Sequence, residues 1–314
     1  MYKVLVIGGV KSTANTFIKL LEHGLNVVGI LGYEPNNSDV VSGWVDLRSL
    51  ALDHSVDYLG FKKINDRKNL NWAKDKFPDI IFAVGFSQLL SGEWLKLPKL
   101  GCIGFHPTNL PEGRGRAPIA WIILEKKMGS ASFFLMTEGA DDGPIFSQSF
   151  FDVVEGDDAR CVENKIGIHI EIALDKWLPE LIKGNWNPEP QDHSKASWYG
   201  KRGPEDGWIN WNNSATYLDR LVKASSLPHP GAYTYFKDKK LIVWKSEVEN
   251  DIKIKGVVGR VLLKNSEKGD LIQCGNGLLW LQEIEIESGR FLKVGDKLGF
   301  NLEDEIYKLK KGYI

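Results

Sequence analysis

The sequence predicts an α/β protein. We expect a Rossmann-like, mostly parallel sheet with helices on both faces, followed by a small C-terminal β-barrel domain of the OB-like kind. Apolar strand-like runs alternate with helical segments over about the first 150 residues, as in parallel sheets. Short strands separated by turns fill about the last 80 residues, as in small barrels. Residues 184–207 are rich in loop formers. We therefore expect domains at 1–200 and 201–314.

The predicted elements follow this alternation along the chain. Residues 3–7 form a continuous, β-branched apolar run, which is typical of a strand buried on both faces. The first domain continues with a helix at 12–22, a strand at 27–31, a loop at 32–42, a helix at 46–54, a strand at 79–84 and a turn plus strand at 98–105. Strands at 132–136 and 145–150 and a helix from 157 complete it. The second has a helix at 214–224 and strands at 231–236, 240–244, 256–263, 271–274 and 278–286. Parallel strands joined by helices imply right-handed crossovers.

Composition excludes several classes of partner. The net charge is −1, so no overall field favours nucleic acid or an anionic membrane. The three cysteines are isolated and fit no zinc spacing, which favours a reducing compartment and no metal. The sequence has no apolar run of about 18 residues, and its amino-terminal apolar run is too short for a signal peptide. We expect a cytoplasmic protein without nucleic-acid or membrane partners.

One loop carries most of the chemical information. Residues 106–118 read His-Pro-Thr-Asn-Leu-Pro-Glu-Gly-Arg-Gly-Arg-Ala-Pro and follow an apolar strand, at the end of which open α/β sheets place their chemistry. Histidine is suited to moving a proton near neutral pH. A second motif, residues 139–145, brings Asp141, whose carboxylate beside an imidazole would hold the ring. The alternatives are a structural histidine and ordinary turn chemistry for the aspartate.

Other motifs give little support for other functions. Gly8-Gly9 lacks the G-x-G-x-x-G spacing of dinucleotide sites, and Lys11-Ser-Thr lacks the glycine spacing of a phosphate-binding loop. Arg114 and Arg116 fit either solvated loop charges or a fork for a phosphate or carboxylate.

These motifs resemble the formyltransferases that use 10-formyl-tetrahydrofolate. The family signature has a histidine, a Ser-Leu-Leu-Pro-like turn, an Arg-Gly-x-x-Pro-like run and an Asp-x-Gly. Here His106, Thr108–Pro111, Arg114–Pro118 and Asp141–Gly143 stand at those places. The likeness continues through Arg202–Asp206, Ile209–Trp211, Pro228–Ala232, Lys240–Trp244 and Gly256, and so covers almost the whole chain.

Two branches of this family share the two-domain layout: methionyl-tRNA formyltransferases, and enzymes that formylate nucleotide-linked amino sugars. Arg114–Trp121 and Tyr199–Asp206 are similar to the formyltransferase domain of the bifunctional enzyme that modifies aminoarabinose for lipid A. The transfer-RNA branch carries a basic loop after its second strand. Residues 33–42 here contain two acids and no basic residue, which is unsuited to a phosphate backbone.

The resemblance implies roles for particular residues. His106 would move the proton, and Asp141 would orient and charge it. Gly104 stands where the family has an asparagine that polarises the formyl oxygen, so a backbone N–H, a water or Asn109 would take that role. The residues expected to bind the folate are Phe82, Val84, Gly85, Phe86, Gln88, Ile119 and Asp142. The residues expected to contact the nucleotide-linked sugar are Thr108, Arg114, Gly115, Arg116, Arg202 and Lys223.

The expected function is therefore transfer of a formyl group from 10-formyl-tetrahydrofolate, a co-substrate, to the amine of a UDP- or dTDP-linked amino sugar of the 4-amino-4-deoxy type, in surface-polysaccharide biosynthesis. A homodimer is possible for this layout. Three alternatives stay open: formylation of methionyl-tRNA, hydrolysis of the formyl donor, and a catalytically impaired folate- or nucleotide-sugar-binding homologue. The last is motivated by Gly104.

Overall fold

The chain divides into two compact units, which we describe separately. The computed structural model describes residues 1–36, 41, 43–85, 87–237, 239–286, 289, 291–299 and 302–312. The first unit comprises residues 1–156 and 161–201, and the second comprises 157–160 and 202–314. Phe86, one of the residues expected to bind folate, lies outside the described residues.

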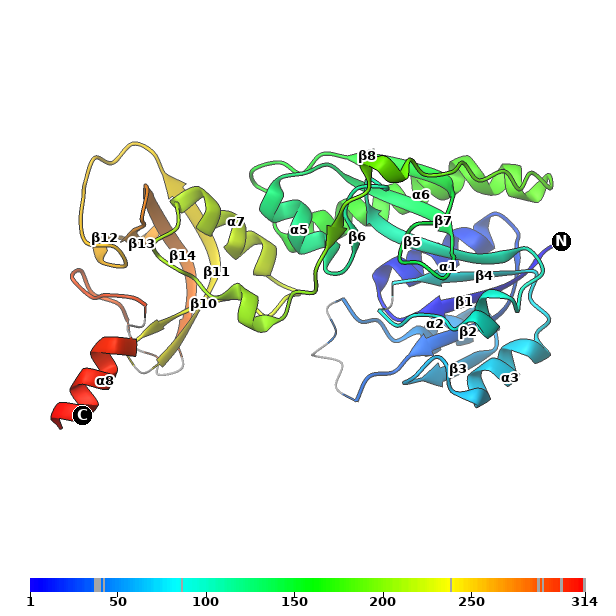
Figure 1. Cartoon of the computed structure of the whole chain (residues 1–314), viewed down its shortest axis with the longest axis horizontal. Helices are drawn as coiled ribbons and strands as arrows, with labels where there is room; N and C mark the ends of the chain where they lie inside the picture. Colours follow the sequence, from blue (N-terminus) through cyan, green and yellow to red (C-terminus); the bar gives the residue numbers. More distant parts are fainter. Residues whose placement is uncertain are drawn as a thin grey trace. The chain divides into compact units, whose positions relative to one another are not determined.

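The first unit is built on a seven-stranded sheet in the order β3-β2-β1-β4-β5-β7-β8 (Figure 1). Its strands are β1 (Lys3–Gly8), β2 (Asn26–Tyr33), β3 (Tyr58–Phe61), β4 (Ile80–Val84), β5 (Gly101–Thr108), β7 (Gly129–Leu135) and β8 (Ile145–Phe151). The first five are parallel, whereas β7 and β8 are antiparallel to their neighbours. The predicted fold class, a mostly parallel sheet with a separate antiparallel C-terminal domain, is confirmed.

Helices cover both faces of this sheet (Figure 1). They are α1 (Lys11–Glu22), α2 (Leu47–Asp53), α3 (Arg67–Asp75), α4 (Gly92–Leu95), α5 (Pro118–Glu125) and α6 (Ala159–Ile182). Leu5 of β1 packs in one core cluster with Leu70 of α3 and Trp94 of α4. On the opposite face, the ring of Phe82 in β4 contacts Trp177 of α6. Strands covered on both faces must be apolar at every position, which explains the continuous run at residues 4–7.

Strand β5 is longer than the sequence predicts, and this difference positions the site. The predicted strand ends at Phe105, but β5 continues through Thr108. Its parallel partner β4 pairs with it only as far as Gly104, whereas the antiparallel partner β7 pairs with it to Thr108. The antiparallel neighbour thus supplies the hydrogen bonds that extend the strand. His106 therefore lies within β5 rather than after it, beyond the point where β4 ends.

The second unit contains a five-stranded antiparallel sheet in the order β10-β11-β14-β13-β12. The strands are β10 (Ala232–Phe236), β11 (Lys239–Glu249), β12 (Val261–Asn265), β13 (Gly269–Gln273) and β14 (Leu278–Ile286). Helix α7 (Ala215–Ser225) packs mainly on β11, and α8 (Leu302–Lys311) follows the sheet in sequence. The inner residues of β10 and β11, such as Ala232 and Leu241, are fully buried, in the alternation expected for a sheet with one covered face.

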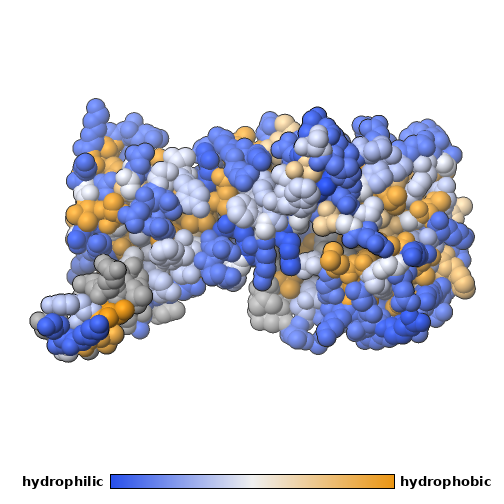
Figure 2. Space-filling view, in the orientation of Figure 1, coloured by the Kyte–Doolittle hydropathy of each residue, from blue (hydrophilic) through white to orange (hydrophobic). Residues whose placement is uncertain are grey.

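Hydrophilic side chains cover most of the face seen in Figure 2, with apolar groups interspersed. Among the described residues, no helix has the length and apolar character needed to cross a bilayer.

Candidate active site

His106 is held inside the protein by its own loop. The residue is 5% exposed, and Nε2 donates a hydrogen bond to the Gly113 carbonyl oxygen at 2.9 Å. Because a carbonyl can only accept, Nε2 carries the proton and Nδ1 is the ring nitrogen left for chemistry. The loop 108–113 is tied by the Thr108 hydroxyl, which donates to the Glu112 carbonyl oxygen at 2.8 Å. The loop therefore fixes both the tautomer and the orientation of the imidazole.

Asp141 faces the free nitrogen of His106. Its Oδ2 lies 3.6 Å from His106 Nδ1 and accepts a hydrogen bond from the Gly115 N–H at 2.9 Å. The sequence prediction that these two side chains come together agrees with this geometry. A proton taken up at Nδ1 would place a positive ring beside the carboxylate, which stabilises the charged form.

The turn that carries Asp141 is strained and closely packed. Asp141 has φ of 54°, in the left-handed region. A Cβ at Gly143 would lie 1.7 Å from the Leu135 carbonyl oxygen, so only glycine fits there. Gln191 Nε2 donates to the carbonyl oxygens of Asp141 and Gly143 at 2.9 and 2.6 Å. Gln191 is not predicted from the sequence, because an isolated glutamine in a polar loop carries no signal of its partners.

Arg114 was expected to contact substrate, but the structure places its guanidinium in the interior. The residue is 2% exposed. Its Nη2 and Nε donate to Gln191 Oε1 at 2.7 and 3.3 Å, and the guanidinium carbon lies 5.6 Å from the Trp198 ring centroid. This arrangement corrects the expectation: Arg114 binds protein groups here, because β6 (Arg114–Gly115) pairs with β9 (Trp198–Tyr199) and turns the side chain towards Gln191.

Some of the other loop residues are hydrogen-bonded within the protein, and others are exposed to solvent. The Thr108 hydroxyl and the Gly115 N–H are engaged by the loop and by Asp141, so neither is directed to a ligand. Arg116 is exposed, and no described residue pairs with its guanidinium. Ile119, at the start of α5, is partly exposed. Arg116 and Ile119 therefore remain available at the surface.

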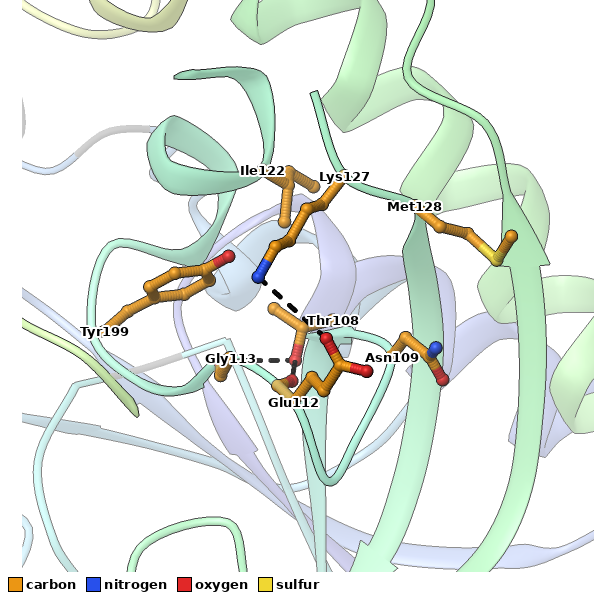
Figure 3. Close-up of a pocket in the computed structure, with 8 residues that line it drawn as sticks. All are labelled: Thr108, Asn109, Glu112, Gly113, Ile122, Lys127, Met128 and Tyr199. Carbon is orange, nitrogen blue, oxygen red and sulfur yellow. Dashed lines mark hydrogen bonds and ion pairs between the residues drawn. The ribbon is translucent and has the colours of Figure 1, made fainter. Parts of the chain in front are cut away.

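Asn109 is found at a cavity, and His106 Nε2 is bonded to Gly113 instead. The cavity has a volume of about 130 Å³, and its other lining residues are Thr108, Glu112, Gly113, Ile122, Lys127, Met128 and Tyr199 (Figure 3). Neither His106 nor Asp141 lines this cavity. Burial, together with a hydrogen bond from its hydroxyl to Glu125, raises the pKa of Tyr199. The expected role of Asn109 as a donor beside the imidazole therefore lacks support from its position.

The space at Gly104 is filled by a neighbouring strand. Gly104 pairs with Phe134 across β5 and β7. A Cβ at Gly104 would lie 2.5 Å from Phe134 Cζ and 3.0 Å from Met136 Cγ. The Phe134 ring thus fills the space that a side chain at position 104 would need, and an asparagine there would require the ring to move.

The residues expected to bind folate differ in accessibility. The side chains of Phe82 and Val84 are fully buried. Strand β4 pairs with β1 through Val84 but with β5 only through Ala83, so a ligand could reach Val84 only through its main chain. Gln88 is half-buried, with its amide bonded to Ile64 N and the Lys62 carbonyl oxygen. Gly85 and Asp142 are partly exposed, and Asp142 accepts a hydrogen bond from the Thr137 hydroxyl. The accessible part of this region is therefore the strand end, from Gly85 onward.

The loop after β1 is satisfied within the chain. The N–H groups of Gly9 and Val10 donate to Thr13 Oγ1 at 3.0 and 3.2 Å, and this hydroxyl donates to the Val84 carbonyl oxygen at 2.7 Å. In a dinucleotide site such N–H groups would face a pyrophosphate.

Arg202 and Lys223 belong to the second unit. Arg202 Nη2 donates to the Asp206 carbonyl oxygen at 2.7 Å, and Lys223 Nζ forms an ion pair with Asp219 at 2.5 Å.

Within the described part of the chain, no three His, Cys, Asp or Glu side chains are arranged to hold a metal ion.

An imidazole with one free nitrogen beside a carboxylate, near the end of a strand in a Rossmann-like sheet, is able to carry out acid–base group transfer. Comparison with known families identifies the group: residues 53–175 match the family described as formyl transferase, and residues 201–299 match the formyl transferase C-terminal domain. The chain belongs to the formyl transferase family, whose members are formyl-transfer enzymes that use formyl-tetrahydrofolate.

Individual relatives point to more than one branch. The chain is 31% identical over 230 residues to the bifunctional polymyxin resistance protein ArnA of Wigglesworthia glossinidia brevipalpis, covering 73% of this chain and 35% of that protein. It thus spans about a third of the length of that relative. It is 26% identical over 306 residues to the methionyl-tRNA formyltransferase of Geobacter sulfurreducens, covering 96% and 95% of the two chains.

A solved structure shares the fold. The N-formyltransferase from Helicobacter canadensis, in complex with folinic acid and dTDP-3-aminofucose, superposes with a TM-score of 0.67 at 16% identity, covering 90% of this chain and 99% of that one.

Proposed function

We propose that the protein transfers a formyl group from 10-formyl-tetrahydrofolate to the amine of a nucleotide-linked amino sugar of the 4-amino-4-deoxy type, a reaction of surface-polysaccharide biosynthesis. Family membership supports the formyl chemistry. The observation that carries the choice of acceptor is the loop after β2. Residues 33–42 contain two acids and no basic residue of their own. Arg48 pairs with one of these acids, Glu34, and Lys62 contacts Asn36. The loop itself therefore presents no cation to the phosphate backbone of a transfer RNA.

His106 performs the proton transfer in this account. Its Nδ1 takes a proton from the acceptor amine as the amine nitrogen bonds to the formyl carbon, and the proton then passes to the folate nitrogen when its bond to that carbon breaks. Nε2 stays bonded to the Gly113 carbonyl oxygen, so the ring does not rotate during the transfer. Asp141 Oδ2, 3.6 Å from Nδ1, stabilises the imidazolium that forms.

The carboxyl-terminal end of β4 is the region that we assign to the folate. When bound, 10-formyl-tetrahydrofolate supplies the activated formyl group. Gly85 has φ of 68°, and the chain leaves β4 at this residue. Leu89, four residues further on, is 74% exposed. A planar, partly apolar ring would cover such an exposed leucine favourably. Gly85, Gln88 and Leu89 are therefore the residues we assign to the donor, together with Asp142 of the turn between β7 and β8 and Ile119 of α5.

Arg116 is the group of this unit that we assign to the acceptor phosphates. Its guanidinium is exposed and unpaired among the described residues, and it follows directly on Gly115, which holds Asp141. A planar cation with several donors fits a phosphate well.

The experiment is a transfer assay with 10-formyl-tetrahydrofolate and a panel of acceptors: UDP- and dTDP-linked 4-amino sugars, a dTDP-linked 3-amino sugar, and methionyl-tRNA. Product is detected by mass, and a reaction without acceptor measures hydrolysis of the donor. We expect one 4-amino sugar to be formylated, with no product from His106→Ala. Turnover confined to methionyl-tRNA would refute the sugar assignment.

Formylation of methionyl-tRNA is the second candidate. It is favoured by the match of nearly the full chain to methionyl-tRNA formyltransferases, whereas the ArnA match covers 73% of this chain. A third candidate, a folate-binding homologue without turnover, rests on Gly104 and on the ring that fills its space. Folate binding without product from any acceptor would favour this third candidate.

A further inference from the structure

We propose that Gln191 and Arg114 form a positioning pair that holds Asp141 at its working distance from His106. The inference rests on the proposed function, because it concerns the rate of the same proton transfer. Neither residue touches His106. Both act through the turn that carries Asp141.

A continuous chain of contacts links the pair to the carboxylate. Arg114 Nη2 donates to Gln191 Oε1 at 2.7 Å, and Gln191 Nε2 donates to the Asp141 carbonyl oxygen at 2.9 Å. Gln191 is 7% exposed and Arg114 is 2% exposed. Buried hydrogen bonds of this kind hold their partners in a fixed geometry, since breaking them leaves polar groups unsatisfied.

The direction of each contact fixes the amide. Arg114 can only donate, so Gln191 must present its oxygen to it. The carbonyls of Asp141 and Gly143 can only accept, so Gln191 must present its NH₂ to them. Both ends of one side chain are thus used, and neither a flipped amide nor a carboxylate reproduces the pattern.

The turn depends on this support. Asp141 has φ of 54° and belongs to no strand. Among the side chains that the structure describes, Gln191 alone donates to the main chain of Asp141 and Gly143. The Gly115 N–H holds the carboxylate from the other side, and Gly115 follows Arg114 in β6. Arg114 itself is fixed by Trp198 and by His193 Nδ1 at 3.2 Å. One short strand therefore sets both the side chain and the main chain of Asp141.

The decisive variant is Gln191→Glu, which keeps an acceptor for Arg114 and removes both donors to the turn. We expect kcat for formyl transfer to fall about 10- to 100-fold, as for small misplacements of a reacting group. KM for donor and acceptor should stay within about twofold, because Gln191 contacts neither. Ser147→Ala, which removes a buried side-chain bond to the Ala173 carbonyl oxygen, is the matched control and should retain kcat.

A second measurement, NMR of the His106 ring, can be made without an acceptor substrate. In protein labelled with ¹⁵N-histidine, the His106 ring resonances, assigned with His106→Gln, should shift in Gln191→Glu and stay in place in Ser147→Ala. Arg114→Lys, which keeps the cation but gives up the planar two-donor contact, should shift the same resonances and provides the test if Gln191→Glu does not fold.

A folded Gln191→Glu or Arg114→Lys with wild-type kcat and unchanged His106 resonances would overturn the inference. A wild-type protein that formylates no acceptor would instead overturn the proposed function, and the histidine spectra would still decide the positioning role.

Discussion

Asp141 Oδ2 lies 3.6 Å from His106 Nδ1 while the same oxygen accepts the Gly115 N–H at 2.9 Å. The carboxylate is therefore held by the backbone of the loop that also fixes the histidine, and its charge is aimed at the one ring nitrogen without a main-chain partner. This relationship, rather than either residue alone, is the basis on which we propose proton transfer at this site.

Asp141→Asn should preserve the fold, because the amide oxygen can still accept from Gly115, but it removes the charge beside His106. We expect kcat to fall about 100- to 10,000-fold, the range for loss of acid–base assistance. Steady-state transfer assays measure the effect. Asp79→Asn, which removes an ion pair with Lys99 just before the amino-terminal end of β4, is the control and should keep its rate.

The effect of a side chain at position 104 on the free energy of unfolding should depend on its neighbour Phe134. Gly104→Ala places a Cβ against that ring, and overpacking of this size should lower the free energy of unfolding by about 1–3 kcal/mol. Phe134→Leu should restore part of the loss, so the two changes should be non-additive in a double-mutant cycle measured by urea unfolding. Additive effects would show that the ring is not what excludes a side chain at position 104.

Arg116→Ala should weaken binding of a phosphate-bearing acceptor. The guanidinium is exposed, so we expect KM for the nucleotide-linked sugar to rise about tenfold with little change in kcat, as for a contact made equally in the ground and transition states. Initial-rate measurements at several salt concentrations check this, since screening should reduce the difference. An unchanged KM would remove Arg116 from the acceptor site.

Glu249 should make the second unit sensitive to acid. Hydrogen bonds from Trp280 Nε1 and the Asp251 N–H, with a further one from Ile252, lower the pKa of Glu249 from 4.5 to about 2. A depressed pKa contributes stability above pH 4.5 that is lost as the pH falls towards 2. Glu249→Gln should lower the free energy of unfolding by about 1–3 kcal/mol at pH 7 and much less at pH 2.5.

Thermal unfolding at the two pH values, followed by circular dichroism, measures this difference between wild type and Glu249→Gln. An equal loss at both pH values would mean that the carboxylate charge is not the source of the stabilisation.

The sequence predicted most of the first sheet, because buried parallel strands must be continuously apolar and those runs are visible at residues 3–7 and 79–84. It placed the end of β5 too early, since the antiparallel partner β7 that extends the strand is invisible to local pattern. For the site, spacing and resemblance pointed to His106 and Asp141, which the structure brings together. The positions of two other predicted site residues depend on tertiary packing, which the sequence pattern does not reveal. Arg114 turns inward to Gln191, and Asn109 lines a cavity that His106 does not line.

Proton transfer by His106 and Asp141 is best tested by single-turnover formyl transfer at saturating 10-formyl-tetrahydrofolate and acceptor, comparing wild type with His106→Asn and Asp141→Asn. We expect a measurable rate for the wild type and rates at least about 100-fold lower for both variants, with folate binding retained. Variants that transfer formyl at the wild-type rate would contradict the assignment of proton transfer to this pair.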